Sequence, residues 1–524
     1  MAIINSVLSW IMQQRGPQIE LFKKHPHDVQ NDWLSYLLKM GKDTEWGRHY
    51  DFRSIHSAQE FRTRIPLQNY ESLQPLINRM MQGEHDILWP GEISWYAKSS
   101  GTTNDKSKFI PVSEEALADC HFKGGKDLLS MYFQNRPHSQ FFTGKGLVLG
   151  GSHQVSQLNP ESYYGDLSAV LIENLPFWAQ YYKVPHRSIA LMNEWELKLD
   201  RMTAATLKMN ITSISGVPTW TLLLIKKILA HTGASNLLEV WPNLEVYFHG
   251  AVSFTPYREQ FRQLIPSDSM YYMETYNASE GFFGLQDQAG SDEMLLMLDY
   301  GIYYEFIPLE NLHAGNDQAI GLESVELNKN YALVISTNSG LWRYLIGDTV
   351  IFTSLYPYRM QISGRTRHYI NAFGEELMID NAEKALVYAC EHTQALVRDY
   401  TAAPVYYSDK ESGCHEWMIE FEKHPVSLTL FTALLDQELQ RLNSDYEAKR
   451  YKGMALKMPI VHSVAEGTFY NWLKSKSKLG GQHKVPRLSN TRLYLEEILA
   501  LNPNCLRETF ATTQKQAPEE QTAC

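Results

Sequence analysis

The amino-acid sequence predicts an α/β protein of two domains, a large N-terminal one of layered sheets and helices and a smaller α+β one. The chain has 524 residues, more than one hydrophobic core usually supports. Apolar strand patterns alternate with helical patterns over most of its length, as in layered α/β proteins. The pattern changes after Gly364, so we assign residues 1–364 to the large domain, 365–368 to a hinge and 369–524 to the small domain.

The large domain is expected to begin with an amphipathic helix over residues 1–15. Apolar residues recur there at helical spacing, and the cleavage site of a signal peptide is missing. Serine, threonine and proline mark the starts of later helices, because they cap or fit the first helical turn. We expect these helices at residues 113–134, 217–230 and 255–264, and strands at 147–149, 244–248, 271–275, 302–307 and 331–336.

The small domain is long enough to hold a core of its own. Its apolar pattern predicts helices at residues 381–390, 426–442 and 465–473, and strands at 405–407, 417–421 and 459–464.

Charge and cysteine content argue against several classes of protein. The net charge of −11 disfavours a nucleic-acid partner, because such proteins need a basic face to neutralise phosphates. Five cysteines without a CxxC pair indicate reduced thiols and a cytoplasmic protein. The spacing of histidines and cysteines does not suggest zinc, and no apolar run approaches the roughly 20 residues that span a bilayer, so we expect no membrane insertion.

The clearest functional motif is Lys-Ser-Ser-Gly-Thr-Thr-Asn-Asp-Lys-Ser-Lys at residues 98–108. Its glycine allows a ligand to approach the backbone, and its hydroxyls and amides can donate hydrogen bonds to phosphate oxygens. It is not a Walker A loop, since no Gly-Lys pair is followed by serine or threonine. A polar surface turn is the competing interpretation. The candidate phosphate-binding residues are Ser99, Ser100, Gly101, Thr102 and Thr103.

Two further motifs contain groups that suit a nucleotide. Residues 276–281 follow a predicted strand, and ligands bind at strand ends in α/β sheets. Tyr276 can stack on a base there, and Glu280 can hold Mg²⁺ beside phosphates. In residues 340–348, Asp348 can accept hydrogen bonds from ribose hydroxyls, and Arg343 can pair with Asp348 or with a phosphate. An ordinary turn is the alternative for each motif.

Taken together and in this order, the motifs resemble those of a bacterial member of the acyl-acid amido synthetases, whose plant members conjugate auxin and jasmonate to amino acids. That family belongs to the superfamily of luciferases, acyl-CoA ligases and peptide-synthetase adenylation domains. The resemblance extends from about Gly91 to Arg487. It implies that the large domain is an adenylate-forming domain and the small one a mobile lid.

The resemblance also implies roles for individual residues. The serines, glycine and threonines of 99–103 would hold the phosphates of ATP, and Glu280 would bind Mg²⁺. Tyr276 would stack on the adenine, and Asp348 would take the ribose hydroxyls with help from Arg365. Lys484, within a lysine loop at 480–487, would bridge the substrate carboxylate and the α-phosphate. Other nucleotide-binding residues would be Gly250, Ala251, Val252, Asn277, Ala278 and Ser279.

The implied activity is ATP-dependent activation of a carboxylic acid as its acyl-AMP, followed by transfer of the acyl group to an amine such as an amino acid. Two anions meet in the first step, so Mg²⁺ and the Lys484 ammonium are needed for charge stabilisation. A rotation about the charged boundary segment, with Arg365 and Arg367 as hinge residues, would then admit the second substrate. The acyl pocket is less clear: Val217 and Trp220 are candidates, and the core is the alternative place for Trp220.

Two positions depart from the pattern of the family. Leu345 stands where plant members usually have a second arginine, and Arg367 stands where most of the superfamily has an acidic hinge residue. Two alternative functions share the nucleotide site: an acyl-CoA ligase with the same first step, and a nucleotide-binding protein that has lost catalysis. An RNA-acting adenylating enzyme is disfavoured by the net charge.

Overall fold

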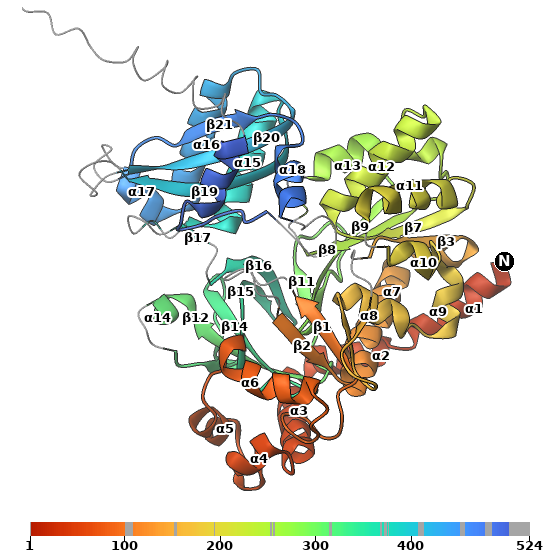
Figure 1. Cartoon of the computed structure of the whole chain (residues 1–524), viewed down its shortest axis with the longest axis vertical. Helices are drawn as coiled ribbons and strands as arrows, with labels where there is room; N and C mark the ends of the chain where they lie inside the picture. The colour runs from red at the N-terminus through yellow and green to blue at the C-terminus, as the bar shows by residue number, and fades with distance from the viewer. Residues whose placement is uncertain are drawn as a thin grey trace, which may run out of the picture. The chain divides into compact units, whose positions relative to one another are not determined.

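The computed structural model describes residues 2–99, 108–150, 155–192, 194–251, 254, 257–313, 317–366, 369–370, 375, 377–406, 413–450, 456–476 and 485–501. The chain forms two compact units (Figure 1). The large unit contains residues 1–254, 261–366 and 480–482, and the small unit contains residues 255–260, 367–479 and 483–524. No helix in the described ranges is both long enough and apolar enough to cross a membrane.

One sheet of twelve strands organises the large unit. Its spatial order is β13-β12-β14-β15-β16-β11-β10-β9-β8-β7-β3-β6. The strands from β6 to β9 pair in parallel, and the rest of the sheet is antiparallel. The parallel strands are β3 (Lys145–Val148), β6 (Lys183–Val184), β7 (Ile211–Ser215), β8 (Val246–Gly250) and β9 (Tyr271–Ala278). The antiparallel strands are β10 (Gly281–Leu285), β11 (Met294–Leu296), β12 (Ile302–Pro308), β13 (Ile320–Gly321), β14 (Asn330–Thr337), β15 (Tyr344–Leu355) and β16 (Tyr358–Arg365).

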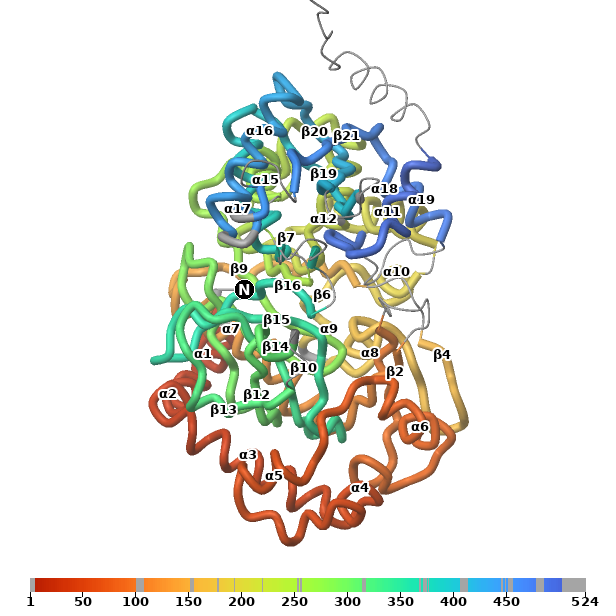
Figure 2. Tube along the Cα trace, turned by 90° about the vertical axis from the view of Figure 1, so that its left-hand side faces the viewer, coloured from red at the N-terminus to blue at the C-terminus, as the bar shows by residue number. Residues whose placement is uncertain are grey.

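Helices connect the parallel strands, since parallel neighbours require crossovers. Between β3 and β9 these helices are α8 (Leu167–Glu173), α9 (Phe177–Tyr182), α10 (Arg187–Ala190), α11 (Trp195–Thr206), α12 (Pro218–Thr232) and α13 (Arg258–Leu264). The N-terminal helices are α1 (Ala2–Gln13), α2 (Gly16–Lys24), α3 (Pro26–Gly41), α4 (Glu45–His49), α5 (Ala58–Arg64) and α6 (Tyr70–Met81); they lie in the red and orange part of Figure 2. The buried Gln30 on α3 donates hydrogen bonds to the carbonyl oxygens of Leu298 and Ile302, which fixes α3 beside β12.

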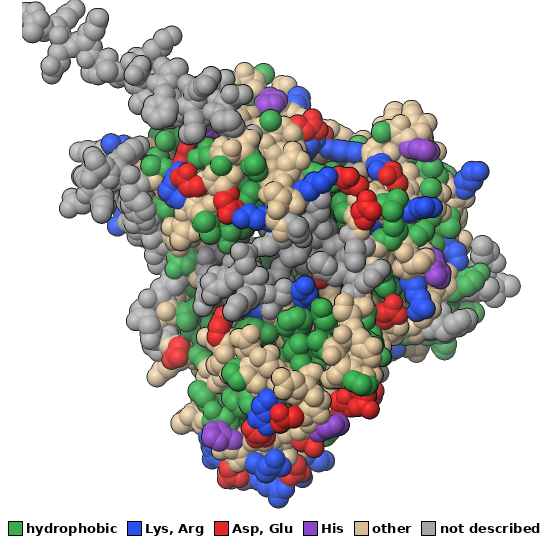
Figure 3. All heavy atoms as spheres, in the orientation of Figure 1, with side chains coloured by type: hydrophobic (Ala, Val, Ile, Leu, Met, Phe, Trp, Pro, Cys, Tyr) green, Lys and Arg blue, Asp and Glu red, His purple; other side chains and the backbone are tan. Residues whose placement is uncertain are grey.

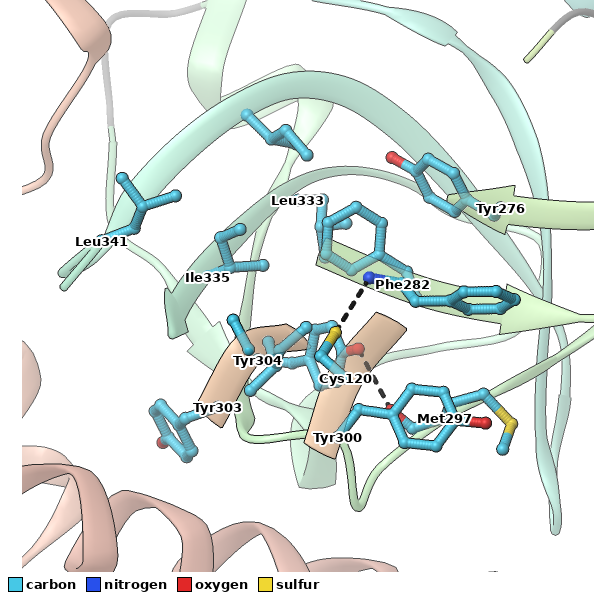
Figure 4. Close-up of a cluster of buried hydrophobic side chains, with 14 of the residues drawn as sticks. Cys120, Tyr276, Phe282, Met297, Tyr300, Tyr303, Tyr304, Leu333, Ile335 and Leu341 are labelled. Atoms are coloured by element: carbon cyan, nitrogen blue, oxygen red, sulfur yellow. Dashed lines mark hydrogen bonds between the residues drawn. The ribbon is translucent and has the colours of Figure 1, made fainter. Parts of the chain in front are cut away.

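A second sheet of four strands has the order β2-β1-β5-β4. Its strands are β1 (Trp95–Ser99), β2 (Lys108–Val112), β4 (Ser156–Gln157) and β5 (Tyr163–Gly165). After β2 the chain forms a π-helical segment, η2 (Ala116–Phe122), which continues as α7 (Lys123–Asn135). In the core, the Cys120 thiol of η2 accepts a hydrogen bond from the Phe282 amide at 3.1 Å (Figure 4). This contact fixes η2 against β10.

The small unit contains a sheet of order β19-β20-β21, in which β19 (Leu396–Tyr406) and β20 (Gly413–Lys423) are antiparallel and β21 (Ile460–Val464) is parallel to β20. Two short strands, β17 (Tyr369–Ile370) and β18 (Leu377–Met378), pair with each other. The helices are α15 (Ile379–Thr393), α16 (Leu428–Leu442), α17 (Ser444–Arg450), α18 (Thr468–Ser475) and α19 (Leu493–Leu501). Trp417, Phe431 and Leu435 are fully buried in its core.

The predicted elements are present with shifted bounds. The helix expected at 113–134 exists, and the Ser113 hydroxyl caps it by accepting the Ala116 amide, but part of it is wound as a π-helix. The strand expected at 271–275 extends to Ala278. In the small unit β19 and β20 are longer than predicted, whereas β21 lies within the predicted range 459–464. The expected cap at Thr255 lies outside the described residues.

Candidate nucleotide site

The segment predicted to bind phosphates connects two paired strands. Ser99 ends β1, Lys108 begins β2, and the two residues are direct antiparallel partners. The start of β2 is fixed by Tyr70 of α6, whose hydroxyl accepts the Phe109 amide at 2.8 Å and whose ring lies 5.6 Å from Lys108 Nζ. Ser100, Gly101, Thr102 and Thr103 lie outside the described residues, so their roles stay predictions.

The second motif forms the tip of the β9–β10 hairpin. Tyr276, Asn277 and Ala278 belong to β9, which corrects the expectation that the strand ends at residue 275. Ala278 pairs with Gly281, so Ser279 and Glu280 form a two-residue turn. Burial raises the pKa of the Glu280 carboxyl, while the Lys108 ammonium acts on that pKa in the opposite direction. A carboxylate in such a place is stabilised by a cation.

Three strands bring three predicted residues together at Asp348. Tyr276 of β9 donates its hydroxyl hydrogen to Asp348 Oδ2 at 2.7 Å, and Nε of Arg365 on β16 lies 2.8 Å from Oδ1. Asp348 and Arg365 are also cross-strand partners in the β15–β16 pair. Each carboxylate oxygen keeps a further lone pair, so Asp348 can still accept hydrogen bonds from ribose hydroxyls.

A bulge in β15 sets the direction of the Asp348 side chain. The register between β14 and β15 shifts by two extra residues of β15 between Leu345 and Thr349, and Gly347 within that stretch has a φ of 92°. Bulges of this kind re-aim side chains and often occur beside functional sites. Glycine suits Gly347 because side chains rarely tolerate that backbone conformation.

The end of β8 lies beside β9. Gly250 is paired with Thr275, and a Cβ on Gly250 would clash with the Thr275 carbonyl oxygen, so a glycine is needed for the close approach. Ala251 has a left-handed φ of 72°, an unusual conformation for alanine that is more frequent at functional sites. Gly250 therefore ends a parallel strand, and Ala251 follows it, at the edge where ligands bind in such sheets. Val252 lies outside the described residues.

Arg343, a predicted nucleotide contact, is bound to protein groups in the structure. Its side chain is buried, with Nε donating to Glu305 Oε2 at 3.0 Å and Nη1 donating to the carbonyl oxygens of Arg62 and Ile65. These partners occupy the guanidinium away from Asp348. Burial raises the pKa of Glu305 and Arg343 lowers it, as expected for an internal ion pair.

Leu345, the position at which plant members usually have a second arginine, lies against a small apolar cluster. Leu345 packs against an apolar cluster of Ile307, Ala332 and Val334, whereas its neighbours Tyr344 and Ile346 belong to the main core. Leu345 therefore packs against a different apolar cluster from its two neighbours in the chain.

Trp220 lies in the core rather than in a pocket. It is 6% exposed and makes an edge-to-face contact with Trp195 at 4.7 Å. Val217 is the N-cap residue of α12, with Pro218 in the first turn. The structure thus favours the core alternative for Trp220, and the role of Val217 in an acyl pocket stays a prediction.

The sequence did not indicate His121, which lies beside the second motif. Its Nδ1 is 3.2 Å from Asn277 Oδ1, and burial lowers the pKa of its imidazole to about 4. The ring is therefore neutral at pH 7, and Nδ1 carries the proton that it donates to Asn277. π-helical segments often occur at functional sites, but no sequence pattern predicts this one.

In the small unit, Lys484 and Arg367 lie outside the described residues. The chain that follows Lys484 is bound to β19, because the Ala402 amide donates to the Arg487 carbonyl at 2.8 Å and the Ser489 amide donates to the Ala402 carbonyl at 3.1 Å. The Arg487 side chain pairs with Asp399 and lies 4.7 Å from the ring centre of Tyr400.

Three family models match the chain in order. The GH3 family N-terminal domain matches residues 15–270, the GH3 family central domain residues 295–365 and the GH3 family C-terminal domain residues 380–493. The chain belongs to the GH3 family.

Two curated GH3 relatives match over most of their length. A probable indole-3-acetic acid-amido synthetase of Arabidopsis thaliana is 24% identical over 90% of this chain and 90% of the relative. A jasmonoyl–L-amino acid synthetase of Oryza sativa subsp. japonica is 24% identical over 90% of this chain and 94% of the relative.

Two solved structures share the fold. A GH3.15 acyl acid amido synthetase has a TM-score of 0.76 at 17% identity, covering 92% of this chain and 95% of that one. A 2-hydroxyisobutyryl-CoA ligase in the postadenylation state has a TM-score of 0.55 at 14% identity, covering 91% of both chains. The GH3 chain therefore has the fold of adenylate-forming ligases.

Proposed function

We propose that this GH3 protein is an ATP-dependent ligase that activates a carboxylic acid as its acyl-AMP and transfers the acyl group to an amine such as an amino acid. The observation that carries the proposal is the convergence of Arg365 and Tyr276 on Asp348, with Tyr276 on the same β9–β10 hairpin as Glu280. The curated relatives of this chain are named as acid-amido or amino acid synthetases. The substrates would be small molecules, and nothing in the proposal requires a nucleic acid.

In the first step an oxygen of the substrate carboxylate would attack the α-phosphorus of ATP, and the bond from that phosphorus to pyrophosphate would break. Asp348 would hold the ribose, the segment from Ser99 to Lys108 would hold the phosphates, and Lys484 would offset the charge of the two reacting anions. The amine would then attack the acyl carbonyl, lose a proton and release AMP.

The described residues fit Mg²⁺ in this role. Mg²⁺ is usually held by one or two carboxylates together with substrate phosphates, and Glu280 supplies one carboxylate whose pKa is raised by burial. The buried Ser279 hydroxyl beside it has no hydrogen-bond partner among the residues that the structure describes, so it could serve a ligand. Bound Mg²⁺ would supply charge stabilisation to the phosphates.

We further propose that residues 365–368 act as a hinge between domains 1–364 and 369–524. The ion pair with Asp348 ties Arg365 to the large unit, and the segment 261–366 of that unit ends within the proposed hinge. Free thiols at Cys120, Cys390 and Cys414 support a cytoplasmic location.

An acyl-CoA ligase is the second candidate, because one neighbour of the same fold is a CoA ligase. A homologue that has lost catalysis is the third, and the presence of Glu280, Asp348 and Lys484 speaks against it.

ATP–pyrophosphate exchange with a panel of aryl, indolyl and fatty acids tests the proposal, followed by mass spectrometry of products formed with mixed amino acids or with coenzyme A. We expect exchange that depends on one class of acid, and an amide product. Lys484→Ala should lower exchange on the order of 10²–10³-fold while ATP still binds, whereas Lys474→Ala, on α18, should not. A thioester product would select the second candidate, and ATP binding without exchange would select the third.

A further inference from the structure

The hydroxyl of Tyr344, the first residue of β15, is buried and unpaired. The residue is 0% exposed, and its hydroxyl has no hydrogen-bond partner in the described part of the chain. Leaving a buried polar group unsatisfied costs about 1–3 kcal/mol. A ligand that accepts a hydrogen bond from the Tyr344 hydroxyl would explain why this buried group has no protein partner.

An unpaired hydroxyl alone is not a site, since Tyr272 on β9 and Tyr400 on β19 have unpaired buried hydroxyls as well. Tyr344 differs from both in its surroundings. Its backbone pairs with that of Gln68, two residues before Tyr70 of α6. Burial raises the pKa of its hydroxyl most, Glu280, Glu71 and Tyr70 raise this pKa further, and Arg365 lowers it. Two of these four, Glu280 and Arg365, belong to the candidate nucleotide site.

The other two groups, Tyr70 and Glu71, belong to α6, which contacts the end of the phosphate segment. Tyr70 holds the Phe109 amide through its hydroxyl, and its ring lies 5.6 Å from the Lys108 ammonium, so Tyr70 marks the C-terminal end of the 98–108 motif. Tyr344 therefore lies beside the chain that leads into Tyr70, on the strand that carries Asp348. We assign the phosphates of ATP to the segment whose end Tyr70 holds, and the ribose to Asp348.

A phosphate group matches the unsatisfied hydroxyl chemically. The tyrosine hydroxyl is a donor, the phosphate oxygens are acceptors, and hydrogen bonds to charged groups are stronger than those between neutral groups. We propose that the Tyr344 hydroxyl donates a hydrogen bond to a phosphate oxygen of ATP, which makes Tyr344 a binding residue of the nucleotide site. This inference rests on the proposed function.

The test compares Tyr344→Phe with Tyr272→Phe, which removes an equally unpaired buried hydroxyl from the same unit. The Tyr272 ring lies among the aromatic rings of Tyr247, Phe254 and Phe261. Thermal unfolding without ligand reports stability, and calorimetric titration with MgATP and with AMP reports binding. Removal of an unpaired hydroxyl should leave the melting temperature of both variants at or above that of the wild type.

We expect Tyr344→Phe to weaken MgATP binding roughly tenfold or more, the size of a hydrogen bond to a charged group, and Tyr272→Phe to bind as the wild type does. Weakened AMP binding would assign the bond to the α-phosphate, and unchanged AMP binding would assign it to the β- or γ-phosphate.

Unchanged MgATP affinity in Tyr344→Phe would overturn the inference and leave the proposed function standing. A clear loss of stability in Tyr344→Phe without ligand would overturn it too, because the hydroxyl would then have a structural partner. A wild type that does not bind MgATP would overturn both.

Discussion

At the scale of single residues, the Asp348 carboxylate is the centre of the candidate nucleotide site, because a tyrosine and an arginine from two other strands both contact it. Tyr276, Asp348 and Arg365 were each predicted from a motif, and the structure joins them through two contacts to one carboxylate. Arg343 was predicted as well, yet it is buried against Glu305. A motif gives the type and order of residues, while the direction of each side chain depends on bulges and pairing that only the fold determines.

Substitution Asp348→Asn should weaken ATP binding and lower stability together. The amide keeps an acceptor for one neighbour but removes the charge that offsets the Arg365 guanidinium, so we expect the KM for ATP to rise about tenfold and the free energy of unfolding to fall by about 1–3 kcal/mol. Pyrophosphate exchange and urea denaturation measure the two effects.

Asp287→Asn is the matched control, because Asp287 pairs with Arg359 of the same strand β16, with 2.8 Å between the partner atoms. This control should lose stability without a change in KM. Equal KM values in all three proteins would contradict the role of Asp348 in ribose binding.

At the scale of elements, the sequence predicted the position of the helix after β2 but not that its first part is a π-helix. The π-helical segment η2 depends on tertiary contacts: the Cys120 thiol bonds to the Phe282 amide, and Gly124 of α7 lies against the Phe282 ring, where a Cβ would lie 2.6 Å from the ring. Helical periodicity shows which face of such a segment is apolar and cannot report contacts with a distant strand. The same limit explains why His121 was missed.

His121 should make the large unit sensitive to acid. Its folded pKa of about 4 lies below the 6.5 of a free imidazole, so the unfolded chain takes up a proton first as pH falls, and stability is lost between pH 6.5 and pH 4. From pH 7 to pH 5 this loss amounts to about 2 kcal/mol. Urea denaturation of wild type and His121→Gln at both pH values should show a correspondingly smaller loss in the variant.

The control for that comparison is His231→Gln on the exposed side of α12. Between pH 7 and pH 5 its free energy of unfolding should change by the same amount as that of the wild type. If His121→Gln also followed the wild type, the imidazole would have to be charged or solvated in the folded state.

At the scale of the whole molecule, each unit has a hydrophobic core of its own. The core of the large unit includes Leu333 and Ile335 of β14 (Figure 4), and that of the small unit includes Leu435 of α16. On the face drawn in Figure 3, the acidic and basic side chains of the described residues are interspersed. A chain of this length requires more than one core, and the change of sequence pattern after Gly364 is the basis for the domain boundary that we propose at residues 365–368.

Leu435→Ala should therefore unfold the small unit at a lower temperature and leave nucleotide binding intact. Truncating a fully buried leucine costs about 2–5 kcal/mol, and all described residues of the candidate nucleotide site lie in the large unit. Calorimetry should show two transitions of which only one moves, with unchanged MgATP affinity. Leu333→Ala, in the core of the large unit, should instead lower the other transition and weaken MgATP binding. A single transition that moves equally in both variants would mean that the two cores unfold as one, and the division into domains at residues 365–368 would then have no thermodynamic basis.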